Sequence, residues 1–127
     1  MRSTTALTVA SLLSILLFSL HVTDDIVRGF EGGGIANLAV VLIFAIWLYG
    51  TLVLAERRSG YVIILLGSLM GLAVPILHMR GRGVGEIAGS SGGFFFIWTL
   101  IALGVTSLFS VVLAVRGLWS LSWRRAQ

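Results

Sequence analysis

The chain has 127 residues, of which 57% are hydrophobic and 11% are charged, and its formal net charge is +4. Soluble domains carry roughly 25% charged residues, so this composition excludes an ordinary water-soluble fold and indicates that lipid surrounds most of the chain. The positive charge does not indicate nucleic acid, because the arginines flank apolar runs, as topology determinants of membrane proteins do. The sequence has no cysteine, which excludes disulfides and thiolate metal sites.

Apolar runs in the chain predict four transmembrane helices. The expected spans are 4–23, 35–55, 61–79 and 94–119, each close to the roughly 20 residues that a bilayer requires. Uninterrupted runs of this length predict helices rather than barrel strands, because membrane backbone must satisfy its own hydrogen bonds. We therefore predict an all-α, polytopic membrane protein in which residues 1–127 form a single domain, a four-transmembrane-helix bundle.

The first run follows Arg2, a pattern that could open a secretory signal peptide. It ends in Leu20-His21-Val22-Thr23, without a small-x-small cleavage site. We therefore expect the first run to be retained as a transmembrane helix.

Arginine counts predict the orientation of the helices. The arginines near the two ends of the chain and in the second loop outnumber those in the first and third loops. The side with more arginine faces the cytoplasm. We therefore expect a multi-pass protein of a bacterial inner (plasma) membrane, with both termini cytoplasmic and the first and third loops outside.

Small residues recur at four-residue spacing in two of the expected helices. The third run contains Gly67 and Gly71, and the fourth contains Ala102, Thr106, Ser110 and Ala114. Helices in lipid associate through close packing of such residues. These rows could mediate helix packing within one chain, between the chains of a homo-oligomer, or with partners in a larger membrane complex. The sequence does not distinguish these three kinds of contact.

Polar residues gather at the expected outer ends of the first and third helices. They are His21, Asp24, Asp25, Arg28 and Glu31 from the first loop region, and His78, Arg80, Arg82 and Glu86 from the third. If the first helix continues through this stretch, one of its faces carries His21, Asp24, Asp25 and Arg28, which are spaced at i, i+3, i+4 and i+7. The two sets could then converge over the outer mouth of the bundle.

Three interpretations of this polar cluster stay open. It could be a set of ion pairs that serves as a recognition surface. It could hold a divalent metal through His21, Asp24, Asp25 and His78, or a haem with the two histidines as axial ligands. The sequence has no HxxxH or HExxH spacing to support either cofactor.

The third interpretation is an oligomeric channel or carrier for a small solute. Acidic residues at a helix end beside glycine-rich loops suit a vestibule. Ionisable residues near the bilayer midplane usually mark a transport pathway. The central parts of the four runs have no ionisable residue, and their candidate polar residues are serine and threonine. Rows of these hydroxyls from several chains would have to line the pathway.

We favour a non-enzymatic membrane protein that acts as an accessory or partner-binding component, with the polar cluster as its recognition surface. Small size and the absence of any catalytic residue set support this interpretation, and no enzyme is expected. A haem- or metal-binding redox protein is the alternative, and the oligomeric channel or carrier is a further one.

Overall fold

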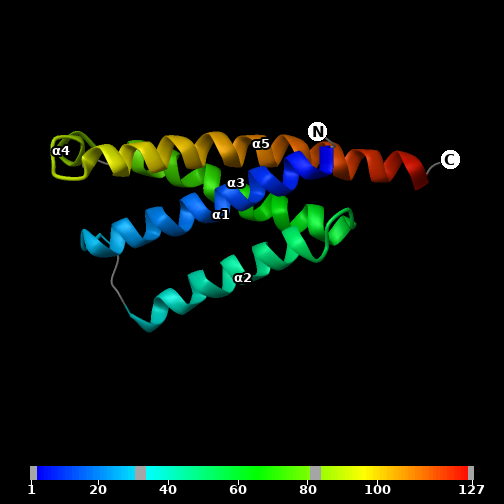
Figure 1. Ribbon diagram of the computed structural model, residues 1–127, viewed down its shortest axis with the longest axis horizontal. Helices are drawn as coiled ribbons and strands as arrows, with labels where there is room; N and C mark the ends of the chain where they lie inside the picture. The colour runs from blue at the N-terminus through cyan, green and yellow to red at the C-terminus, as the bar shows by residue number, and fades with distance from the viewer. Residues whose placement is uncertain (1–2, 31–33, 81–83, 126–127) are drawn as a thin grey trace.

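The computed structural model describes residues 3–30, 34–80 and 84–125 of the chain (Figure 1). This part of the chain is helical and contains no strand, as the sequence predicts. The elements in order are α1 (Ser3–Val27), the 3-10 turn η1 (Ile35–Asn37), α2 (Leu38–Leu52), α3 (Arg58–Arg80), α4 (Val84–Ala88) and α5 (Gly93–Arg125).

Among the described residues, three helices are long and apolar enough to cross a membrane. These are α1, α3 and α5, with candidate spans at Thr4–Val27, Arg58–Met79 and Gly93–Trp123. Helix α2 has 15 residues, which at 1.5 Å per residue is about 22 Å and short of the roughly 30 Å hydrocarbon core. The predicted second span, 35–55, is therefore shorter as a helix than the apolar run suggests, and four spans are not established.

Helix α5 is the centre of the arrangement. It packs along both α1 and α3, while α2 lies at one side and packs chiefly against α3 (Figure 1). Helices α1 and α3 run in the same direction and α5 returns antiparallel to them, so the start of α1 and the end of α5 lie toward the same end (Figure 1). Many large apolar side chains face outward from the helices, which suits contact with lipid.

The buried positions of α1 and α5 repeat in alternating steps of four and three residues. The repeat consists of Leu7, Ser11, Ser14, Phe18, His21 and Asp25 on α1, and of Gly93, Phe96, Leu100, Leu103, Ser107, Ser110 and Ala114 on α5. Thr99 is also buried on α5, next to this repeat. A 3.5-residue repeat of this kind is typical of helices that pack knobs into holes with a left-handed twist.

The glycines of the predicted packing motif contact different helices. Gly67 lies directly against the indole ring of Trp47 on α2, and Gly71 lies against the side chain of Ser107 on α5. Each glycine therefore allows a close approach that a larger residue would block.

On α5, the predicted four-residue row is buried unevenly. Ser110 and Ala114 are buried, whereas Ala102 and Thr106 are half-buried. The Thr106 hydroxyl donates to the backbone carbonyl of Ala102 at 2.9 Å. The buried face follows a 3.5-residue repeat rather than a four-residue one. The N-terminal members of the row, Ala102 and Thr106, therefore lie at the edge of the buried face rather than within it.

Hydroxyl groups occupy the middle of the bundle. The Trp47 indole Nε1 donates to Ser11 Oγ at 2.9 Å, and Ser11 Oγ lies 2.8 Å from Thr51 Oγ1. These bonds attach α1 to α2. By contrast, within the described part of the chain the buried hydroxyls of Ser68, Ser107 and Ser110 have no hydrogen-bond partner.

Candidate metal centre

His21, Asp25 and His78 meet near the end of the bundle where α1 and α3 finish and α5 begins. Nε2 of His21 and Nε2 of His78 each lie 3.5 Å from Oδ2 of Asp25. One ligand atom from each of the three residues lies within 4.8 Å of the other two. Helix α1 continues past the predicted limit at residue 23 to Val27, which places His21 and Asp25 one turn apart on one face.

This cluster is largely closed off from the surroundings of the molecule. His21 is fully buried and Asp25 is 6% exposed, while the His78 side chain is 29% exposed. A buried carboxylate is costly unless it is paired with a positive charge or coordinates a metal. A cation held between the members of the cluster would offset this cost.

A backbone carbonyl fixes the protonation of the His78 ring. His78 Nδ1 lies 2.9 Å from the carbonyl oxygen of Val74, and a carbonyl oxygen can only accept a hydrogen bond. Nδ1 must therefore carry a hydrogen. In the neutral ring Nε2 then has a free lone pair, and Nε2 lies 3.5 Å from Asp25 Oδ2.

Thr99 fixes the other ring in the same way. Its hydroxyl donates to the carbonyl oxygen of Phe96 at 3.0 Å. The hydroxyl oxygen can therefore only accept from His21 Nδ1, which lies 3.4 Å away. In the neutral His21 ring Nε2 again has the free lone pair, and this nitrogen also lies 3.5 Å from Asp25 Oδ2.

Two imidazole nitrogens with free lone pairs thus lie close to the same carboxylate oxygen. Histidines that bind metals almost always donate their other ring N–H to a carbonyl, carboxylate or water, which orients the ring. Val74 and Thr99 fill that supporting role here. The donor set of two imidazoles and one carboxylate is one that zinc and non-haem iron use.

The distances between the donors also suit a small metal ion. Two ligands that are each about 2.1 Å from a zinc ion at a tetrahedral angle lie about 3.4 Å apart. The two histidine–aspartate separations are 3.5 Å each. An ion can therefore lie between the carboxylate and either imidazole with little movement of the side chains.

A haem does not fit the same residues. Axial imidazoles on opposite faces of one haem have ring centroids about 6 Å apart, since each metal–nitrogen bond is about 2 Å long. The ring centroids of His21 and His78 are 4.8 Å apart, and the rings meet edge to face. Phe96 packs against both, with centroid distances of 5.0 and 5.7 Å, so no slot for a macrocycle separates them.

Asp24 and Arg28 lie beside the cluster but outside it. Arg28 Nε donates to Asp24 Oδ2 at 2.7 Å, and Arg28 Nη1 donates to Ser90 Oγ at 3.2 Å. The guanidinium carbon is 5.6 Å from the centre of the Phe96 ring. This arginine therefore ties the end of α1 to the turn before α5, above the aromatic ring that covers the histidines.

The other residues of the predicted polar cluster do not join the centre in the described part of the chain. Glu86 is exposed on α4. Arg80 ends α3, but its side chain lies outside the described ones. Glu31 and Arg82 lie outside the described residues.

Sequence reasoning missed Thr99 and Phe96, which orient and cover the centre. A signal for Thr99 was present, because it is the only polar residue between Phe94 and Leu103. In a helix that runs antiparallel to α1, this position falls at the level of His21. Phe96 carries no comparable signal among its phenylalanine neighbours.

Comparison with protein-family models, with curated proteins and with solved structures finds no match for this chain.

Proposed function

We propose that this chain is a small membrane protein that binds one divalent transition-metal ion through His21, Asp25 and His78. The observation that carries the proposal is that two oriented imidazoles each place Nε2, the nitrogen with the free lone pair, 3.5 Å from one oxygen of a buried carboxylate. Three apolar helices of spanning length support the membrane location. The arginine distribution supports an extracytoplasmic position for the centre in an inner membrane.

The donor set supports zinc or ferrous iron rather than calcium or magnesium. Calcium and magnesium prefer oxygen ligands, and two of the three donors here are imidazole nitrogens. Structural zinc sites are usually closed by four protein ligands, whereas sites with three leave a position open for water or another ligand. An open position favours an ion that is taken up and released, or that binds a further ligand, over a purely structural ion.

Burial favours this function over a recognition surface made of the same residues. A surface that docks a partner presents its polar groups outward, whereas His21 is fully buried and Asp25 nearly so. Membership of a larger membrane complex stays compatible with the proposal, because the outward faces of the helices are not used by the metal centre.

A zinc titration tests the proposal. The full chain is purified in mild detergent, freed of metal with a chelator and titrated with Zn²⁺. We expect one zinc per chain in the unchanged protein and loss of that binding in Asp25→Asn. The matched control is Asp24→Asn, because this neighbouring carboxylate pairs with Arg28 instead, and it should bind zinc like the unchanged protein. Equal binding by Asp25→Asn, or equal loss in both variants, would contradict the proposal.

A further inference from the structure

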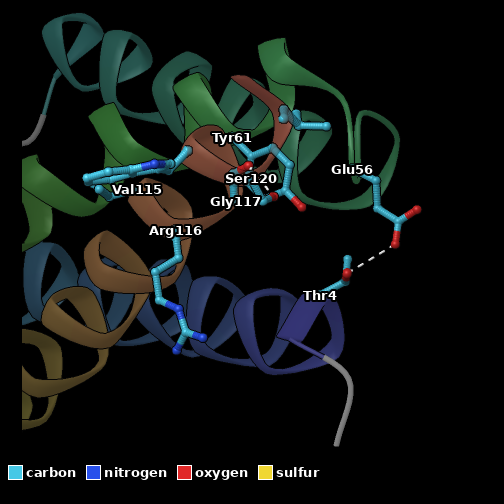
Figure 2. A pocket seen from close by; sticks show the side chains of 9 residues that line it. Thr4, Glu56, Tyr61, Val115, Arg116, Gly117 and Ser120 are labelled. Atoms are coloured by element: carbon cyan, nitrogen blue, oxygen red, sulfur yellow. Dashed lines mark hydrogen bonds between the residues drawn. The ribbon is translucent and has the colours of Figure 1, made fainter. Parts of the chain in front are cut away.

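A second polar site lies at the opposite end of the molecule from the metal centre. It is a pocket of about 660 Å³ between the start of α1, the α2–α3 turn and the last third of α5 (Figure 2). Its polar lining comes from Thr4, Glu56, Tyr61, Arg116 and Ser120, and Trp119 also lines it. No residue of the metal centre contributes to it.

The pocket lies at the level where the helices would leave the hydrocarbon. The candidate span of α1 begins at Thr4, that of α3 begins at Arg58, and that of α5 ends at Trp123. Trp119 is 63% exposed, and tryptophan is enriched where lipid headgroups meet the acyl chains. A ligand in this pocket would therefore share the space of the headgroups.

The pocket carries two opposite charges that do not neutralise each other. Glu56 comes from the α2–α3 turn and Arg116 from α5, and Figure 2 shows their side chains extending apart. Within the described residues neither forms an ion pair, and Glu56 Oε1 accepts a hydrogen bond from Thr4 Oγ1 at 3.0 Å. A ligand that carries a positive and a negative group at separate points would complement both.

The backbone of Glu56 supports a role for its side chain. Its φ angle is +65°, in the left-handed region that glycine adopts freely and that other residues adopt at a cost. The turn would be more relaxed with glycine at this position. Backbone strain of this kind concentrates at functional sites, and here it holds a carboxylate at the edge of the pocket.

We propose that this pocket binds the headgroup of an aminophospholipid, in which a phosphate and a primary ammonium are linked by a short chain. Arg116 would pair with the phosphate, with the Tyr61 hydroxyl as a further donor, since guanidinium–phosphate hydrogen bonds are strong. Glu56 would accept hydrogen bonds from the ammonium. A purely anionic headgroup fits less well, because it would meet the Glu56 carboxylate. The proposal requires a membrane-embedded chain but not the metal centre.

Native mass spectrometry of the purified chain with phosphatidylethanolamine or phosphatidylglycerol tests this site. We expect the unchanged protein to retain phosphatidylethanolamine in preference. Arg116→Gln should weaken binding of both lipids by about tenfold, as loss of one charge-assisted contact implies. The matched control is Arg57→Gln. Arg57 is exposed in the α2–α3 turn, near the pocket, but does not line it, so this variant should bind both lipids like the unchanged protein.

Two variants of Glu56 separate its ligand role from a role in folding. Glu56→Gln should abolish the preference for phosphatidylethanolamine over phosphatidylglycerol. Glu56→Gly should abolish it as well while raising the melting temperature, because glycine relieves the backbone strain. The proposal is overturned if either variant keeps the preference, if the unchanged protein retains phosphatidylglycerol equally well, or if Arg57→Gln weakens binding as much as Arg116→Gln.

Discussion

His78 Nε2 lies 3.5 Å from Asp25 Oδ2 and so joins the end of α3 to the end of α1. Because His21 on α1 approaches the same oxygen, an ion bound here would link the two parallel helices directly. Metal binding should therefore affect the stability of the whole bundle as well as the occupancy of one site.

Zinc should raise the melting temperature of the metal-free protein. A ligand that binds only the folded state adds about 2.7 kcal/mol when its free concentration is about 100 times Kd. Thermal unfolding followed by circular dichroism measures the shift. His78→Ala should remove it, while Met79→Ala, a neighbour that is 75% exposed, should keep it. A zinc-dependent shift that survives in His78→Ala would show that the ion binds elsewhere.

The Thr99 hydroxyl should control zinc affinity although it does not touch the ion. It accepts from His21 Nδ1 and so orients the ring, and loss of such a partner typically weakens metal binding 10–100-fold. We expect Thr99→Val to weaken zinc binding by about that factor and Thr99→Ser to retain it. Titration against a competing chelator measures the difference. Equal affinities for the two variants would count against the orienting role.

Part of the site could be predicted from the sequence because it is local to one helix. The i, i+4 spacing of His21 and Asp25 predicts a shared face, and the structure brings the two together. Asp24 and Arg28 share the spacing but form their own pair beside the cluster. The approach of His78 depends on how α3 packs against α1, and no local pattern in the sequence specifies that.

The limits of α2 could not be predicted from hydropathy alone. The apolar run continues to Ala55, yet the helix ends at Leu52, and residues 53–57 connect it to α3, which begins at Arg58. The left-handed conformation of Glu56 belongs to this turn, and a glutamate gives no sequence signal for it. The predicted four-residue row on α5 departs from the buried face for a related reason, since the packing repeat is 3.5 residues.

Gly67→Ala should loosen the contact between α3 and α2. A Cβ at this position would overlap the Trp47 ring, and overpacking of this kind typically costs about 1–3 kcal/mol. Gly85→Ala is the control, because nothing lies within 4 Å of a Cβ there. Thermal unfolding should show a lower melting temperature for the first variant and no loss for the second. Unchanged stability in Gly67→Ala would mean that α2 does not pack as described.

Two buried serines should respond in opposite ways to alanine. Ser11→Ala leaves the Trp47 indole N–H without its acceptor, and an unsatisfied buried donor costs about 1–3 kcal/mol. The Ser110 hydroxyl has no partner within the described residues, so Ser110→Ala should be neutral or stabilising. Denaturation of both variants in the same detergent compares them. Equal destabilisation would indicate that Ser110 holds a hydrogen bond through water.

X-ray absorption spectroscopy of the zinc-loaded protein tests the central claim most directly, because it reads the ligands of the ion itself. We predict a first shell that contains two imidazole nitrogens and a carboxylate oxygen at about 2.0–2.2 Å. The signal of one imidazole should disappear in His78→Ala. A first shell of oxygen atoms alone, or two imidazoles that persist in His78→Ala, would contradict the assignment of His21, Asp25 and His78 as the metal centre.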